Sequence, residues 1–173
     1  MEDTTLSITG IIIAAIIMFI VPLVMIADRN DDISQLLVET YTAEFVDDII
    51  KTGEITNEDY EQYLISLGTS GNTYEVSIEL KILDENPARR HTNLTGGTGE
   101  NSYYSLFTTQ IEEELNRNER MVLKEGDIIS VTTSNSSKTL SQTLKSIYYT
   151  ISGGDLHIIS GTSSGTVAVN GAI

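Results

Sequence analysis

The longest feature of the hydrophobic pattern is an uncharged run near the start of the chain. Residues 6–26 read LSITGIIIAAIIMFIVPLVMI and contain no charged side chain. As a helix, about 21 residues would extend about 31 Å, which matches the hydrocarbon core of a bilayer. A secretory signal peptide would have a basic flank and a shorter apolar run, whereas Glu2 and Asp3 precede this one. The pattern therefore favours a membrane-spanning helix.

The helical pattern continues beyond this run. Apolar residues recur at steps of three and four over residues 33–50, namely Ile33, Leu36, Leu37, Tyr41, Phe45, Ile49 and Ile50. After residue 26 no glycine or proline intervenes until Gly53, which is a plausible end for the helix. We therefore predict one long helix over residues 4–52 with an amphipathic second half. The side chains expected to dock this half on the downstream domain are Leu36, Leu37, Tyr41, Phe45 and Ile49.

Two features of the apolar half bear on how it packs. Gly10 and Ala14 are four residues apart and form a small-residue patch, which permits close approach of a second helix. Pro22 lacks a backbone N–H, so it predicts a bend or a loosened turn. Two interpretations of Pro22 stay open: a proline tolerated within a membrane helix, and a bend that lets the helix pack in an assembly.

The remainder of the chain, residues 53–173, is expected to form one α+β domain. Thr56, with Asp59 three residues later, is typical of the N-cap of a second helix, which would complete a helix hairpin. Alternating apolar and polar residues predict a strand over residues 74–83. Further elements are expected at residues 108–118 (helix), 128–133 (strand), 139–149 (helix), 156–160 (strand) and 166–170 (strand), and residues 84–102 are expected to form an exposed polar loop. This order predicts a small antiparallel sheet.

Charge and composition exclude several classes of function. The 173 residues include 25 acidic and 10 basic side chains, for a net charge of −15, which disfavours binding to nucleic acid or to anionic headgroups. Cysteine is absent, which excludes disulfides, thiolate metal sites and cysteine nucleophiles. The chain is therefore expected to hold itself together by packing or by assembly with neighbours.

No group of residues predicts chemistry. His91 and His157 lie in different predicted segments and show no metal-ligand spacing. The acidic stretches at residues 28–32 and 84–86 lack the pattern of a dedicated calcium loop, so solvated acidic turns are favoured. The glycines of residues 96–99 and 161–165 match neither a phosphate loop nor a nucleophile elbow. We therefore expect no catalytic residue, no metal and no cofactor.

The flanks of the apolar run give little information on its orientation. Arg29 is the only cation nearby, and acidic residues surround it. A membrane anchor without a basic flank is unusual. It is explained if Met1 begins a processed chain from which a basic leader has been removed.

An apolar helix with a proline at position 22, continuing into an amphipathic half that docks on a small α+β domain, resembles the type IV pilin superfamily. It is most similar to the Tad-type and TadE-like pilins and pseudopilins of bacteria. Residues 44–83, EFVDDIIKTGEITNEDYEQYLISLGTSGNTYEVSIELKIL, also resemble TadE-like pilins, in which a helix hairpin leads into a strand. The resemblance implies cleavage of a leader by a prepilin peptidase and anchoring in the cytoplasmic membrane. The pilus assembly machinery would then pack the N-terminal helices into the core of an extracellular filament of identical subunits.

The resemblance also implies where subunits meet. The family usually carries a glutamate at the fifth mature position, which pairs with a neighbour's terminal amine. This chain has Thr5 there, and we expect Glu2 or Asp3 to take over the role. The residues expected in the helical core of the filament are Met1, Glu2, Asp3, Gly10, Ala14 and Pro22. Two alternatives stay open: a monomeric, membrane-anchored extracellular module for binding or adhesion, and an anchored enzyme.

Overall fold

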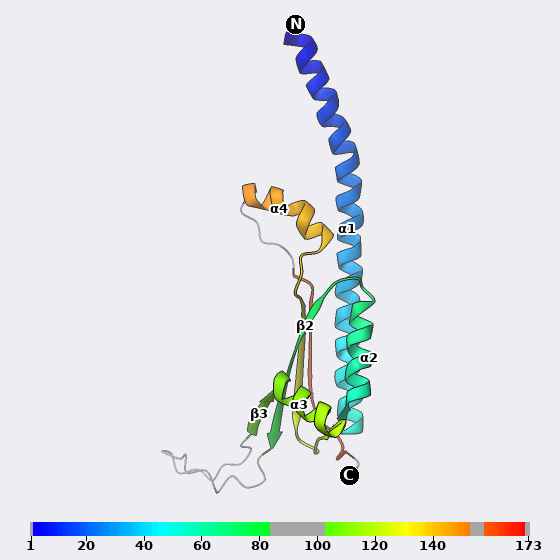
Figure 1. The fold of residues 1–173 in the computed structure, drawn as a ribbon, viewed down its shortest axis with the longest axis vertical. Helices are drawn as coiled ribbons and strands as arrows, with labels where there is room; N and C mark the ends of the chain where they lie inside the picture. Colours follow the sequence, from blue (N-terminus) through cyan, green and yellow to red (C-terminus); the bar gives the residue numbers. More distant parts are fainter. Residues whose placement is uncertain (1, 84–102, 153–157, 172–173) are drawn as a thin grey trace, which may run out of the picture.

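The computed structural model describes residues 2–83, 103–152 and 158–171, and it shows one long helix carrying a small domain (Figure 1). The elements in chain order are α1 (Glu2–Thr52), β1 (Glu54–Thr56), α2 (Asn57–Gly68), β2 (Tyr74–Leu83), β3 (Tyr103–Phe107), α3 (Thr108–Asn118), β4 (Arg120–Val122), β5 (Ile128–Asn135), α4 (Leu140–Ser152) and β6 (Ser160–Thr166). The predicted fold class, a long N-terminal helix followed by a small antiparallel α+β domain, is confirmed.

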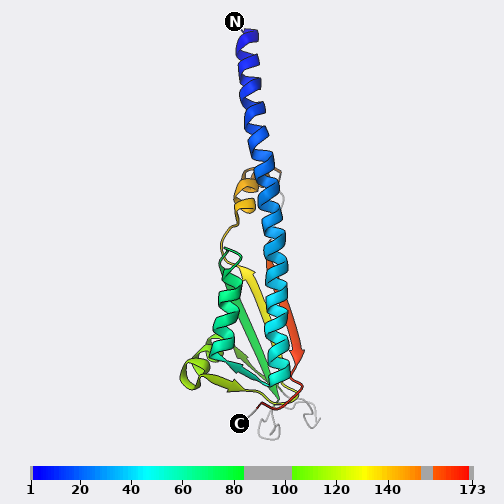
Figure 2. The same cartoon turned by 90° about the vertical axis from the view of Figure 1, so that its right-hand side faces the viewer.

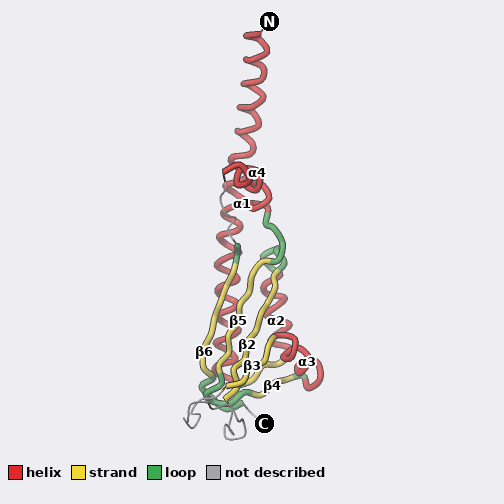
Figure 3. Tube along the Cα trace, turned by 90° about the vertical axis from the view of Figure 1, so that its left-hand side faces the viewer, coloured by secondary structure: helices red, strands yellow, loops and turns green. Residues whose placement is uncertain are grey.

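The domain consists of a four-stranded sheet with helices on one face. The strand order is β3-β2-β5-β6 and every neighbouring pair is antiparallel, while β1 and β4 form a separate two-stranded ribbon. Helices α1 and α2 lie side by side over the same face of the sheet (Figures 2 and 3). The hydrophobic core lies between these two helices and the sheet.

The strongest local signals give the expected elements. Gly53 has a φ of +72° and its N–H bonds to the carbonyl oxygen of Ile49, which ends α1 as predicted. The hydroxyl oxygen of Thr56 accepts a hydrogen bond from the N–H of Asp59 at 3.0 Å, which confirms the N-cap of α2. The short strand β1 precedes α2, however, so the two helices are not joined by a simple hairpin turn.

The prediction for the C-terminal strands is wrong. A single strand, β6, covers the Gly/Ser segment expected to be a turn, and its sequence is SGTSSGT. Gly161 lies opposite Thr133 and Gly165 lies opposite Ile129 in the register with β5. Because this strand has no apolar residue, periodicity could not reveal it. The predicted loop at residues 84–102 lies outside the described residues.

One of the five predicted docking residues on α1 points the wrong way. Phe45 and Ile49 are buried, and Leu37 and Tyr41 are half-buried, but Leu36 is 63% exposed. Successive helical residues differ by about 100°, so Leu36 faces away from Val38, which is buried against the sheet. The buried face of α1 also includes four residues that were not among the predicted docking residues: Ser34, Val38, Thr42 and Val46.

A buried group of three hydroxyls explains why a threonine lies on this face. Thr42 of α1 and Thr133 of β5 lie 2.9 Å and 2.5 Å, respectively, from the hydroxyl oxygen of Tyr63 on α2. Burial raises the pKa of Tyr63, so its hydroxyl stays neutral and can both donate and accept. Helices α1 and α2 and strand β5 are thereby hydrogen-bonded to one another in the core.

Helix α1 lies close to β6 because that strand has almost no side chains on the facing side. A Cβ added to Gly161 would lie 3.1 Å from the carbonyl oxygen of Val38, and one added to Gly165 would collide with the side chain of Ile50. The Gly/Ser sequence of β6 is therefore a requirement for seating the long helix on the sheet.

We expect Gly161→Val to destabilise the domain by about 1–3 kcal/mol, because a larger side chain must push α1 away from β6. Urea unfolding of the full chain in detergent, followed by far-ultraviolet circular dichroism, measures this. Ser164→Val is the matched control, since Ser164 is exposed in the same strand and should tolerate valine. Equal stability of the two variants would contradict the close packing of α1 on β6.

Candidate assembly surface

The first half of α1 extends beyond the domain, and no described part of the chain covers it (Figures 1 and 2). Its large apolar side chains are exposed; they include Leu6, Ile8, Met18, Phe19 and Met25. This helix is long and apolar enough to cross a membrane. A surface of this kind is unstable in water and needs lipid or other protein around it.

The uncovered half is apolar on every side. Ile11, Ile12 and Ile13 are 69%, 54% and 52% exposed, although they point in three directions about 100° apart. A helix docking on a single partner would instead have one apolar stripe. The arrangement suits a helix surrounded completely, either by lipid or by other helices.

The small residues predicted to mediate contact lie on this uncovered surface. Apart from its chain neighbours and the nearby backbone of α1, nothing lies within 4 Å of the position of a Cβ on Gly10, and Ala14 is exposed. A second helix could therefore approach closely at this patch without displacing any part of the chain. The structure places Gly10 and Ala14 on one face of α1 but shows no partner for them.

Pro22 lies within the same half and does not interrupt the helix. Figure 1 shows that the apolar half is inclined relative to the half that lies on the sheet. Glu2 and Asp3 lie in the first turn of α1, and Met1 is outside the described residues. The roles of these N-terminal residues in assembly stay predictions.

The junction between the two halves is held by acidic residues that bind α4. Asp31 is buried and accepts a hydrogen bond from the Thr139 hydroxyl at 2.7 Å. Asp28 forms an ion pair with Lys145 at 2.6 Å and also accepts a hydrogen bond from Ser141. The prediction of a solvated acidic turn at residues 28–32 is therefore wrong.

This junction could not be predicted from local sequence. Thr139 is 108 residues from Asp31, and Ser141 is 113 residues from Asp28. The only signal was a cluster of acids directly after an apolar span, which is equally typical of a solvated flank. The junction fixes the helix to the domain at the level where the apolar half begins.

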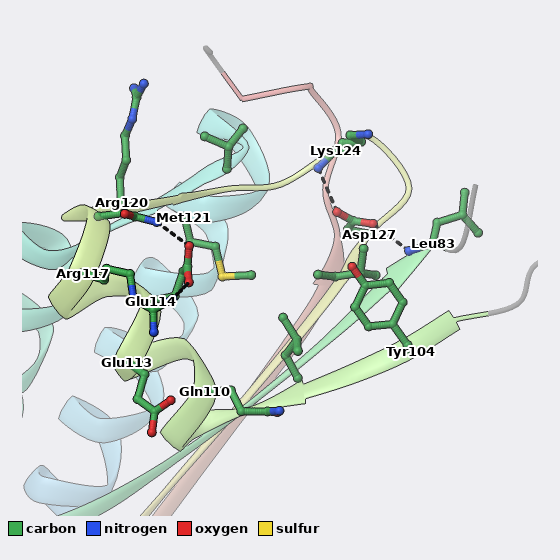
Figure 4. A pocket seen from close by; sticks show the side chains of 14 residues that line it. Leu83, Tyr104, Gln110, Glu113, Glu114, Arg117, Arg120, Met121, Lys124 and Asp127 are labelled. Atoms are coloured by element: carbon green, nitrogen blue, oxygen red, sulfur yellow. Dashed lines mark hydrogen bonds and ion pairs between the residues drawn. The ribbon is translucent and has the colours of Figure 1, made fainter. Parts of the chain in front are cut away.

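One large opening in the described domain lies at the end farthest from the N-terminus. It is a cleft of about 910 Å³ whose lining includes Tyr104, Gln110, Glu113, Arg117 and Met121 (Figure 4). Several of its charged groups take part in structural interactions. Arg117 pairs with Glu114 at 3.6 Å, and both carboxylate oxygens of Asp127 accept backbone N–H groups, from Leu83 and Lys124.

The described residues of the cleft include no group that could hold a metal ion. Among the described residues, no three or more His, Asp or Glu side chains are grouped so as to hold a metal ion. His91, His157, the acids at residues 84–86 and the glycines at residues 96–99 lie outside the described residues. Gly161 and Gly165, by contrast, serve the packing of α1.

Comparisons with known proteins add no family to this geometry. A scan against protein-family models, a search of curated proteins and a search of solved structures find no match for this chain.

Proposed function

We propose that this protein is a structural, pilin-like subunit that polymerises through α1 into an extracellular, type IV-like filament. The observation that carries the proposal is the division of one continuous helix into two halves. The second half is fixed to a folded domain, and the first half is apolar and uncovered on every side. Such a subunit has one element for the core of a polymer and one for its surface.

The same apolar surface serves two stages. Before assembly, residues 6–26 match the thickness of the bilayer and hold the subunit in the membrane. During assembly, the helix exchanges lipid for the apolar helices of other copies, so its side chains never meet water. Because lipid is as apolar as a helix bundle, this exchange gains little hydrophobic energy, and close packing must stabilise the bundle. The patch at Gly10 and Ala14 provides a place for that packing.

The fixed junction between helix and domain gives the polymer its order. The hydrogen bonds of Asp28 and Asp31 to α4, together with the core between α1 and the sheet, prevent the domain from swinging about the helix. The position of each helix in the bundle therefore determines the position of its domain. The acidic domains would form the outer surface of the filament, where their negative charge keeps filaments apart.

Glu2 or Asp3 is proposed to pair with the terminal amine of a neighbouring subunit. Reversing both charges, by Glu2→Lys and Asp3→Lys, is expected to leave export intact and to abolish filaments. Immunoblots of membranes and of sheared surface material from the producing cells measure the two effects separately. Normal amounts of filament from the double variant would show that the acids do not have this role.

The proposal is tested by mechanical shearing of cells that produce the protein. A filament subunit is expected in the sheared fraction as particles of high mass. A monomeric, membrane-anchored module for binding or adhesion would stay with the cells and appear as a monomer in the detergent extract. The second outcome would replace the filament proposal with the anchored module.

A further inference from the structure

Helix α4 occupies a particular place in the molecule. It projects sideways from α1, between the sheet and the uncovered apolar half (Figures 1 and 3). The residues of α1 that it contacts, Asp28 and Asp31, directly follow the apolar run. If residues 6–26 span a bilayer, α4 therefore lies at the level of the membrane surface.

The start of α4 is held firmly at this level. The Thr139 hydroxyl donates to Asp31 at 2.7 Å and accepts from the N–H of Gln142 at 3.2 Å. The side-chain oxygen of Gln142 accepts in return from the N–H of Thr139 at 3.1 Å, which completes a capping box. The carboxylate of Asp31 also lies at the positive end of the helix dipole. The depth of α4 is thus set by the depth of α1.

The sequence of α4 is amphipathic, and the domain covers its described apolar side chains only in part. Leu140 is 57% exposed and Leu144 is half-buried. Apolar residues continue at helical spacing in the sequence at Ile147 and Ile151. An apolar stripe on a helix that projects sideways at the end of a membrane span is typical of helices in the lipid–water interface.

We propose that α4 is an interfacial helix, which inserts its apolar stripe into the headgroup region of the bilayer while α1 spans it. The partner of this surface is lipid, because α4 is attached to α1 at Asp28 and Asp31, directly after the apolar run that would span the hydrocarbon. Attraction to anionic headgroups does not contribute, since the chain is strongly acidic and Lys145 is paired with Asp28. The contact is made by apolar side chains, and it holds the domain at a fixed height above the membrane.

This inference rests on the membrane-anchored stage of the proposed function, and the test separates the two. The chain contains no cysteine, so one introduced cysteine gives one spin-label site. Four variants of the full chain are placed in phosphatidylcholine vesicles: Leu140→Cys on the stripe, Ser146→Cys on the opposite side of α4, Thr162→Cys on the exposed side of β6, and Ile13→Cys in the apolar half. Collision rates of each label with oxygen and with a water-soluble nickel complex report its depth.

The label at position 13 is expected to collide with oxygen and not with nickel. The label at position 140 should show a ratio of oxygen to nickel collisions several-fold higher than the labels at positions 146 and 162. A label at position 140 as accessible to nickel as the one at position 162, with position 13 immersed, would overturn the interfacial helix and leave the anchor standing. A label at position 13 that is accessible to nickel would overturn both the interfacial helix and the membrane anchor.

Discussion

Replacing Phe45 by alanine is expected to lower the free energy of unfolding of the domain by about 3–5 kcal/mol. Phe45 is buried where α1 meets α2, and its ring stacks on Tyr63 with centroids 4.5 Å apart and planes 1° from parallel. It also contacts Tyr60, whose ring centroid lies 6.3 Å away. Alanine would remove these ring contacts and leave a cavity between the two helices. Urea unfolding of the full chain in detergent measures the loss.

Leu36→Ala is the matched control for this prediction. Leu36 lies on the same half of α1 and was predicted from its spacing to dock on the domain, but it is 63% exposed. Its replacement is expected to change the free energy of unfolding by no more than about 0.5 kcal/mol. A loss at Leu36 as large as the loss at Phe45 would show that α1 is rotated about its axis relative to the packing described above.

Replacing Gly10 by leucine is expected to abolish surface filaments while leaving the subunit in the membrane. Leucine keeps the span apolar, so anchoring should not suffer. It fills the open surface beside Ala14, however, and so keeps neighbouring helices from approaching closely. Immunoblots of sheared surface material and of membranes from the same cells give the two amounts.

Ile12→Leu is the control for the substitution at Gly10. Ile12 lies on the other side of the helix and is 54% exposed, and leucine preserves its volume and its apolar character. Filaments are expected from this variant in normal amounts. If Gly10→Leu also gave normal filaments, the small-residue patch would not be a contact between subunits.

The parts of the fold with strong local signals could be predicted from the sequence. Strand β2 and helix α3 have the predicted bounds, because each has a regular apolar period and ends at polar or turn-forming residues. Strand β6 could not be predicted, because its sequence SGTSSGT has no apolar period. Its small residues are explained by the close approach of α1. The prediction for Leu36 is wrong because the buried face of α1 includes a polar residue, Thr42, which is hydrogen-bonded to Tyr63. Apolar spacing alone could not locate that face.

The candidate assembly surface could likewise be predicted only in part. The apolar half of α1 was evident from its composition, and the structure adds that the described domain leaves it uncovered on all sides. The attachment of α4 at Asp28 and Asp31 was not evident, since its partners lie more than 100 residues away in the sequence. Local patterns predict single elements well, whereas contacts between distant elements depend on the whole fold.

The central claim is that α1 is at once the membrane anchor and the core of a polymer. Electron microscopy of material sheared from producing cells, with reconstruction of any filaments and N-terminal sequencing of the subunit, tests it most directly. The account predicts filaments of this one subunit, with a central bundle of parallel helices and the α+β domains on the outside. Absence of filaments from cells that carry the protein, or filaments whose centre lacks these helices, would contradict it.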